Sequence, residues 1–335
     1  MKRYTKIFGA LLPTLAVSLM ASCTDVESIE LNRPGLDEQS SELYAKYLKN
    51  LNDYKESESH KVAYAWFDNS VKNPYSRGQH LSDVPDSLDV VSVTEPADLA
   101  EFELKDMATV RAKGTKVVYT ISFDNIRKEY ADKVIEGTET GAFSAYLQAE
   151  LNRLLGYEAS FDGIIAEYKG SNPIYLSDEA KAEAKAEQDA FFTAIMNWKS
   201  SHADKMLSFM GYPENLMGQN VLTECRHIIL MTDKLEDVQQ LSLVVRKAMI
   251  SSDVPDDRFV VAVSTISMDV TDGKTGYFGK KRAMKEAAYW VTEHSSDYTR
   301  AGIAIYNIQN DYYNADAIYP CVKEAINIMN PAPIK

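Results

Sequence analysis

Short apolar runs alternate along the chain with longer segments whose apolar residues recur at helical spacing. This alternation predicts βα units and a parallel sheet, because the strands of such a sheet are buried on both faces. The expected strands are residues 60–67, 88–93, 116–122, 163–168, 206–211, 227–231, 259–264 and 301–307. The expected helices are residues 104–113, 143–155, 177–198, 235–249 and 280–293.

Eight strand–helix repeats within residues 60–335 fit a single α/β domain, a (β/α)8 TIM barrel. An open doubly wound sheet is the alternative, but no glycine-rich phosphate loop follows any expected strand. One more helix is expected before the barrel, where Leu43, Tyr47, Leu51 and Tyr54 recur at helical spacing. The barrel is therefore expected to follow a short N-terminal tether and helix.

The first residues predict a secretory signal. Lys2, Arg3 and Lys6 form a positive segment, and the apolar residues 7–20 are too few for a membrane span. Residues 20–23, Met-Ala-Ser-Cys, resemble a bacterial lipobox, in which the cysteine is acylated and becomes the mature N-terminus. An ordinary signal peptide is the alternative, since Leu is more usual than Met at the first lipobox position.

The lipobox resemblance implies a lipid on Cys23 and removal of residues 1–22, which leaves residues 23–59 as a tether with a helix. Asp25 and Glu27 follow closely and resemble the acidic export tag of surface lipoproteins in some Gram-negative bacteria. We therefore expect a protein that is lipid-anchored in the outer membrane and exposed at the cell surface.

The composition narrows the class of ligand. The formal charge is −13, and it becomes −16 once residues 1–22, with three cations and no anion, are removed. Such a charge disfavours nucleic acids and suits neutral glycans, although a local basic cleft could override the average. Cys225 and Cys321 could pair or remain buried thiols. The 5 histidines are scattered and no CxxC motif occurs, so we expect neither a metal nor a cofactor.

Residues 161–169, Phe-Asp-Gly-Ile-Ile-Ala-Glu-Tyr-Lys, form the most informative segment. Because side chains on a strand alternate between faces, residues 165, 167 and 169 share the inner face of a barrel strand. Residue 169 lies nearest the C-terminal end of the strand, where barrel active sites are found. Taken alone, the first four residues also fit an ordinary buried strand flanked by turn residues.

The segment resembles the [LF]-D-G-[IV]-D-[IFL]-D-x-E signature of glycoside hydrolase family 18, which contains chitinases and endo-β-N-acetylglucosaminidases. Phe161–Ile164 match, whereas Ile165, Glu167 and Lys169 stand where the family has Asp, Asp and Glu. In that family the Glu protonates the leaving oxygen, and the third acid orients the substrate's own acetamido nucleophile. An ammonium beside Glu167 is held charged and is a poor proton donor, so the resemblance implies that no catalytic set is intact.

Three further segments echo the family in order. Residues 113–122 resemble its third strand, and Leu230–Asp233 resemble an element of its sixth strand without the usual aromatic residue. Residues 302–307, Gly-Ile-Ala-Ile-Tyr-Asn, resemble the last strand of the endo-β-N-acetylglucosaminidase branch rather than the Trp-ended strand of chitinases. The resemblance covers roughly residues 60–320.

Aromatic and polar residues after the strands are the candidate glycan contacts, because aromatic faces stack on sugar rings and barrel clefts open at the strand ends. The expected glycan-binding residues are Trp66, Phe67, Phe123, Glu167, Tyr168, Lys169, Asp233, Tyr306 and Asn307. The wider rim is expected to include Asp68, Asp124, Tyr212, Ser267, Asn310, Tyr312 and Tyr313. Asp162, at the start of its strand, is expected to brace the barrel instead.

Three functions remain open from the sequence. The first is a non-catalytic surface lipoprotein that captures N-acetylglucosamine-containing oligosaccharides, such as N-glycans, for partner glycosidases and an outer-membrane transporter. The second is an active endo-β-N-acetylglucosaminidase, an O-glycosyl hydrolase, in which a displaced acid such as Glu167 or Asp233 donates the proton. The third is a structural or adhesin-like lipoprotein that binds protein. The loss of the acid at position 169 favours the first.

Overall fold

A computed structural model of the chain describes residues 40–218, 221–251 and 253–331. The expected signal peptide, the lipidated Cys23 and most of the tether lie outside these residues. The chain divides after Tyr44 into two units, of which the second, Ala45–Lys335, contains the barrel. No helix in the described ranges is both long enough and apolar enough to cross a membrane.

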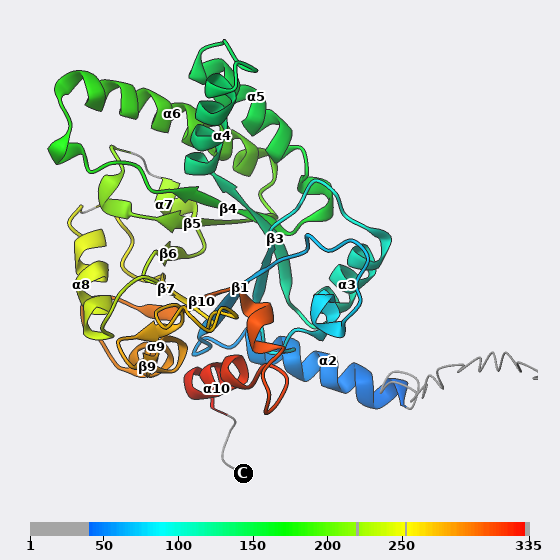
Figure 1. The fold of residues 1–335 in the computed structure, drawn as a ribbon. Helices are drawn as coiled ribbons and strands as arrows, with labels where there is room; N and C mark the ends of the chain where they lie inside the picture. Colours follow the sequence, from blue (N-terminus) through cyan, green and yellow to red (C-terminus); the bar gives the residue numbers. More distant parts are fainter. Residues whose placement is uncertain (1–39, 219–220, 252, 332–335) are drawn as a thin grey trace, which may run out of the picture. The chain divides into compact units, whose positions relative to one another are not determined.

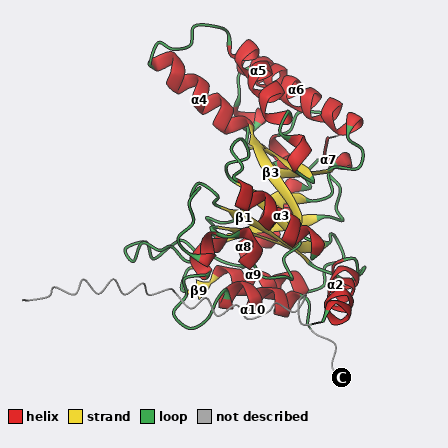
Figure 2. Cartoon of the chain, turned by 90° about the vertical axis from the view of Figure 1, so that its right-hand side faces the viewer, coloured by secondary structure: helices red, strands yellow, loops and turns green. Residues whose placement is uncertain are grey.

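Eight parallel strands close into a barrel, and helices surround it (Figure 1; Figure 2). The barrel strands are β1 (Val62–Phe67), β2 (Val90–Val93), β3 (Lys116–Ser122), β4 (Gly163–Tyr168), β5 (Met206–Gly211), β6 (Ile228–Leu230), β7 (Phe259–Ser264) and β10 (Arg300–Tyr306). Their order around the barrel is β1-β10-β7-β6-β5-β4-β3-β2. The predicted (β/α)8 fold is therefore confirmed, and all eight predicted strands are present to within two residues.

The helices are α2 (Ser41–Lys55), α3 (Glu101–Ala112), α4 (Phe123–Ile135), α5 (Phe143–Leu155), α6 (Asp178–Ser201), α7 (Val221–Glu224), α8 (Gln239–Ala248), α9 (Ala283–Thr292) and α10 (Pro320–Met329). A two-stranded hairpin of β8 (Tyr277–Phe278) and β9 (Lys281–Arg282) lies in the loop between β7 and α9. Periodicity alone missed α4, α7, α10 and the hairpin. In the case of α4, the helix follows β3 directly, with the Ser122 hydroxyl accepting a hydrogen bond from the Asn125 amide at 3.2 Å.

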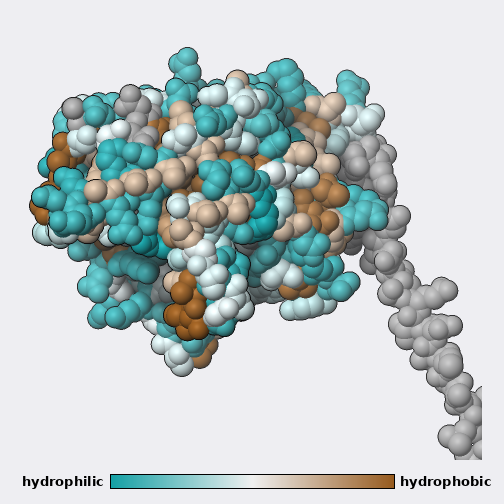
Figure 3. Space-filling view, turned by 90° about the horizontal axis from the view of Figure 1, so that it is seen from above, coloured by the Kyte–Doolittle hydropathy of each residue, from teal (hydrophilic) through white to brown (hydrophobic). Residues whose placement is uncertain are grey.

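Side chains of each strand alternate between two apolar layers. The inner layer fills the barrel and includes Tyr64, Trp66, Val118, Ile165 and Ile229. The outer layer packs between the strands and the helices and is much larger. Burial of both layers leaves mostly hydrophilic residues on the surface, with hydrophobic residues in small separate patches on the face seen in Figure 3. The wall of the barrel is thus held from both sides by the hydrophobic effect.

Ion pairs and hydrogen bonds link the elements at the N-terminal end of the barrel. The Asp162 carboxylate accepts from Arg111 Nε at 2.9 Å and from the Val117 amide at 2.7 Å, which links α3, β3 and β4. Lys55 of α2 donates to the Leu88 carbonyl at 2.6 Å, so the end of this helix is fixed to the same face. Asp162 therefore braces the barrel, as its position at the start of the strand predicted.

His227 lies at this end as a half-buried, neutral side chain. The Tyr64 hydroxyl lies 2.7 Å from its Nδ1 and 2.9 Å from the Ser208 hydroxyl. Burial, with a smaller contribution from the cations of Arg226 and Arg258, lowers the pKa of His227 from 6.5 to about 3. Protonation of the ring in the folded state would place a charge in a poorly solvated position near Arg226 and Arg258.

The depressed pKa of His227 predicts a loss of stability in acid. Because the unfolded chain binds the proton more tightly, stability from this group is complete above pH 6.5 and is lost as the pH falls toward about 3. Between pH 7 and pH 4.5 the loss should be roughly 2–3 kcal/mol. Urea denaturation at the two pH values measures it. A His227→Gln variant should show a smaller drop between them, and an equal drop would contradict the assignment.

Candidate functional site

A cleft of about 1300 Å³ opens at the C-terminal ends of the barrel strands. Inner-face residues at the ends of the strands form its floor, and the loops that follow form its rim. The floor and strand ends contribute Trp66, Thr120, Ser122, Glu167, Met210, Met231, Ser264 and Tyr306. The loops contribute Asn125, Lys169, Tyr212, Asp233, Lys274, Thr275, Tyr277, Gly279 and Asn307, among others. The volume exceeds the roughly 300–1,000 Å³ of typical small-molecule sites and is large enough for an oligosaccharide.

An aromatic pair from β1 and β10 forms part of the floor. The Trp66 and Tyr306 ring centroids lie 4.6 Å apart with their planes at 31°. Trp66 Nε1 donates to the Thr120 hydroxyl at 3.0 Å, and the Tyr306 hydroxyl lies 3.2 Å from the Met210 sulfur. These contacts fix both rings without covering them entirely, since both line the cleft. Fixed, flat apolar surfaces of this kind suit the apolar faces of pyranose rings.

Glu167 and Lys169 form an ion pair at the end of β4. Lys169 Nζ lies 2.9 Å from Glu167 Oε1, and the Glu167 side chain is only 10% exposed. The Lys169 backbone is held on both sides, because its amide donates to Asp124 at 2.9 Å and its carbonyl accepts from Asn215 at 2.7 Å. Ile165 is fully buried in the inner layer, two residues earlier on the same face of the strand. The three positions of the resemblance thus hold one buried apolar group and one self-neutralised pair.

The electrostatics of the cleft make Lys169 and Tyr306 poor proton donors. Partial burial lowers the pKa of Lys169, but the hydrogen bond and negative charge of Glu167 outweigh it, and the pKa is raised overall. Burial also raises the pKa of Tyr306 well above its ordinary value, and the negative charges of Asp233 and Glu167 add to this. Both groups therefore keep their protons at neutral pH. An efficient general acid has a pKa near the working pH, and neither group meets that condition.

Part of the cleft wall comes from a loop that the sequence did not single out. Residues 274–279, which include the hairpin strand β8, contribute Lys274, Thr275, Tyr277 and Gly279 to the cleft. Asp272 shapes the approach to this segment, because its carboxylate accepts from the Lys274 and Thr275 amides, each at 3.0 Å. The run Asp-Gly-Lys-Thr-Gly-Tyr at residues 272–277 carries turn residues followed by an aromatic, and that pattern was a usable signal.

Three of the nine expected glycan contacts lie outside the cleft. Phe67, Phe123 and Tyr168 are buried in the outer apolar layer. The Tyr168 ring packs on Phe123 at 5.0 Å between ring centroids. Phe67 and Tyr168 are the strand neighbours of Trp66 and Glu167, so when those two point inward their neighbours must point outward. Phe123 is the first residue of α4, which turns it under the helix layer.

The other six expected contacts lie in the cleft. Trp66, Glu167, Lys169, Asp233, Tyr306 and Asn307 all line it. Asn307 adopts a left-handed backbone with a φ of 54°, and its side-chain amide donates to the Ser264 hydroxyl at 3.3 Å. The structure therefore brings together residues from β1, β4, β6 and β10, as the barrel prediction required. Their contact with a glycan stays a prediction.

No cluster of metal-ligating side chains occurs within the described residues. Cys225 is buried and Cys321 is half-buried, and both are free thiols. Burial raises the pKa of the Cys225 thiol to about 12 and that of Cys321 to about 11. Both thiols are therefore protonated at neutral pH and are weak nucleophiles.

Comparison with known proteins gives a family and several related folds. The profile described as "Glycoside hydrolase family 18, BT1044-like" matches residues 24–328. A BT1044 variant structure aligns with a TM-score of 0.62 at 17% identity, covering 88% of this chain and 95% of that one. The endo-β-N-acetylglucosaminidase of Cordyceps militaris aligns with a TM-score of 0.61 at 20% identity, covering 85% and 95%.

A more distant structure is a family 18 chitinase from Pseudoalteromonas aurantia, with a TM-score of 0.54 at 11% identity over 80% of this chain and 99% of that one. A mutant of the Cordyceps militaris enzyme, solved in complex with fucosyl-N-acetylglucosamine-Asn, aligns with a TM-score of 0.57 at 19% identity, covering 85% of this chain and 95% of that one. No curated protein sequence matches the chain. At these identities the aligned structures establish the barrel fold.

Proposed function

The chain belongs to the BT1044-like group of glycoside hydrolase family 18, and from that premise we propose that it binds N-acetylglucosamine-containing oligosaccharides without hydrolysing them. The single observation that carries the proposal is the ion pair of Lys169 with Glu167 at the end of β4. It occupies the position where the family signature places its acids.

Hydrolysis needs a carboxylic acid that can give a proton to the leaving oxygen. Lys169 is held charged by Glu167, so it is a poor acid at neutral pH. Glu167 is committed to Lys169 and is mostly buried. Ile165 supplies no charge to share a proton with Glu167. The pair instead offers hydrogen-bond donors and acceptors to sugar hydroxyls and to an acetamido group, beside the aromatic floor of Trp66 and Tyr306.

The ligand class rests on the relatives. The Cordyceps militaris protein is titled an endo-β-N-acetylglucosaminidase, and its mutant was solved with fucosyl-N-acetylglucosamine-Asn. A cleft of about 1300 Å³ has room for an oligosaccharide of this class. The proposed partner of this chain is therefore a glycan such as the N-glycan of a glycoprotein.

The lipobox at Cys23 extends the proposal to the location. We infer that the mature protein is anchored to the outer membrane through a lipid on Cys23 and is exposed at the cell surface. There it would hold oligosaccharides for glycosidases and an outer-membrane transporter of the same uptake system. Metabolic labelling of cells with a fatty-acid analogue tests the anchor, because Cys23→Ala should abolish incorporation into this protein.

Calorimetric titration beside a hydrolysis assay tests the binding function. The protein without its lipid, residues 24–335, should give binding heats with N-acetylglucosamine-containing N-glycan oligosaccharides. The same preparation should release no reducing ends from an N-glycoprotein over a long incubation. Glu167→Gln removes the negative charge of the ion pair but keeps the shape of the side chain, so it serves as the matched variant for both measurements.

Two outcomes would overturn the proposal. Release of reducing ends that Glu167→Gln abolishes would make the protein an endoglycosidase with a displaced acid. Absence of retention by every glycan in the panel would favour a protein-binding or structural role. Binding of glycans without release of reducing ends, by both the parent protein and the Glu167→Gln variant, supports capture of the glycan.

A further inference from the structure

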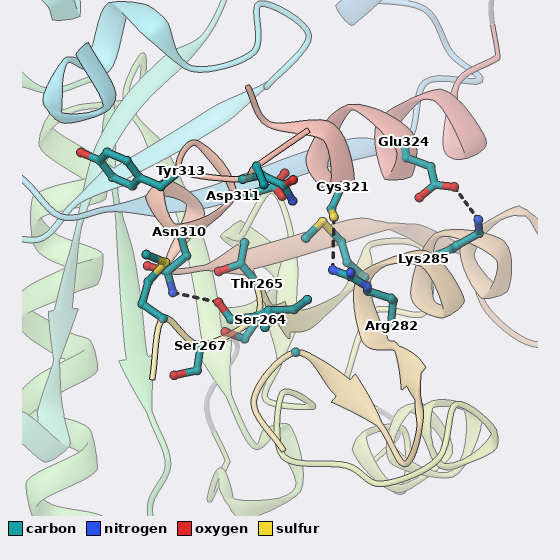
Figure 4. Close-up of a pocket in the computed structure, with 16 residues that line it drawn as sticks. Ser264, Thr265, Ser267, Arg282, Lys285, Asn310, Asp311, Tyr313, Cys321 and Glu324 are labelled. Atoms are coloured by element: carbon teal, nitrogen blue, oxygen red, sulfur yellow. Dashed lines mark hydrogen bonds and ion pairs between the residues drawn. The ribbon is translucent and has the colours of Figure 1, made fainter. Parts of the chain in front are cut away.

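A second pocket of about 430 Å³ lies beside the cleft, between the loop after β7 and the start of α10 (Figure 4). Ser264, the last residue of β7, lines both cavities. The loop between β7 and α9 separates them, because Ile266, Ser267, Met268 and Gly276 face the pocket while its residues 274–275 and 277 face the cleft. A branched glycan in the cleft would thus have a second cavity within reach across one loop.

The walls of this pocket are fixed by hydrogen bonds between loops. The Asn310 side-chain amide, after β10, donates to the Ile266 carbonyl at 3.1 Å. The Thr265 hydroxyl donates to the Asn307 carbonyl at 2.7 Å. The Tyr313 hydroxyl lies 3.2 Å from the Ser76 hydroxyl, which leaves its ring along the wall. These bonds make the pocket a preformed cavity, the usual state of small-molecule sites.

Arg282, at the end of β9, is an exposed residue that lines the pocket without a carboxylate partner. Its guanidinium donates to the Cys321 sulfur at 3.5 Å, a long contact to a weak acceptor. No carboxylate of a described residue lies within ion-pair distance of it. The Cys321 thiol stays protonated because burial raises its pKa to about 11, so it does not neutralise the arginine. Figure 4 shows Arg282 directed at this thiol across the pocket.

The other charges of the pocket are already engaged. Lys285 pairs with Glu324 of α10. The Asp311 carboxylate accepts from the Val322 amide at 2.9 Å, which caps the N-terminus of α10 and removes that end as an anion site. Asp311 keeps its negative charge in the same pocket, so the four formal charges balance, but among the described lining residues Arg282 is the one cation without an ion pair. Its flat fork of donors matches a carboxylate.

We propose that this pocket is an accessory subsite for a sugar unit that carries a carboxylate, such as a sialic or uronic acid, with Arg282 as its anchor. The hydroxyls of Ser264 and Ser267 face the same space and supply partners for sugar hydroxyls. Met268 and the Tyr313 ring supply apolar surface. The subsite rests on the proposed function, since the rest of the glycan occupies the cleft.

Titration with matched glycans tests the subsite. The probes are one biantennary N-acetylglucosamine-containing oligosaccharide with neutral ends, the same oligosaccharide with terminal N-acetylneuraminic acid, and a third with terminal glucuronic acid. We expect an acidic probe to bind about tenfold more tightly than the neutral one, as one charge-assisted bidentate contact provides. The two acidic arms distinguish a sialic acid from a uronic acid as the source of the carboxylate.

Variants at position 282 assign the preference to the pocket. Arg282→Gln keeps hydrogen-bonding groups but removes the charge, so the acidic probe should fall to the affinity of the neutral one. Arg282→Lys keeps the charge without the fork and should retain only part of the preference. Arg246→Gln is the control, since Arg246 is an exposed arginine on α8 that lines neither cavity. It should leave the preference unchanged.

The thiol of Cys321 reports occupancy of the pocket. Bound acidic glycan should slow alkylation of Cys321 at alkaline pH, while the deeply buried Cys225 serves as the unreactive reference. Equal affinity for neutral and acidic probes, or unchanged alkylation with the acidic probe bound, would overturn the subsite while leaving the proposed function standing. Failure of the neutral probe to bind would instead overturn the proposed function.

Discussion

Gly163→Ala should destabilise the barrel by about 3 kcal/mol, although it adds a single methyl group. A Cβ at this position would lie 2.1 Å from the Met206 carbonyl oxygen and 2.7 Å from the Met206 carbonyl carbon. Both are backbone atoms of β5, which pairs with β4 in register at this point. The clash can be relieved only by moving one strand of a closed barrel. Urea denaturation, followed by circular dichroism, measures the change.

Gly273→Ala is the matched control for that substitution. No heavy atom lies within 4 Å of a Cβ built there, and the backbone φ is not in the left-handed region. The control variant should therefore keep the denaturation midpoint of the parent protein. A Gly163→Ala midpoint equal to that of Gly273→Ala would show that the barrel accommodates the methyl group.

Trp66→Ala should lower the affinity for N-acetylglucosamine-containing oligosaccharides about 100-fold, which is the scale of a central aromatic anchor. Trp66 lines the floor of the cleft, and its ring lies against Tyr306. The truncation removes the stacking surface and also frees the Thr120 hydroxyl from Trp66 Nε1. Isothermal titration of the parent and variant with the same glycan measures the loss.

Two further variants separate lost binding from lost folding. Trp66→Phe keeps a flat apolar ring and should keep the fold with only part of the affinity loss. Tyr289→Ala removes an aromatic ring that is 49% exposed on α9 and lies outside the cleft, and it should leave the affinity unchanged. An affinity for Trp66→Ala close to that of Tyr289→Ala would place the glycan elsewhere on the protein.

The packing of β4, which ends just before Lys169, explains why part of the family signature is kept. Gly163 is required by the close approach of β5, and Asp162 braces the N-terminal end through Arg111 and the Val117 amide. These two residues serve the barrel rather than the chemistry. The stability of the barrel therefore accounts for Asp162-Gly163 even where residues 165 and 169 are not acidic.

The sequence by itself determined the barrel, its strands and the absence of the family's acids, because these depend on local patterns. A buried parallel strand is a short apolar run, and alternation places Glu167 and Lys169 on one face. The same alternation would have excluded Phe67 and Tyr168, the neighbours of Trp66 and Glu167. Those two errors came from choosing aromatic residues by type without applying the parity of the strand.

Only the tertiary structure decided how the site is built beyond the strand ends. Phe123 turns under α4 because that helix starts without a loop. The hairpin at residues 277–282 places Tyr277 in the cleft and Arg282 in the second pocket, on opposite sides of one loop. Cys321 and Arg282 lie 39 positions apart and meet through the packing of α9 and α10. Such contacts depend on how elements distant in sequence pack, which no local periodicity encodes.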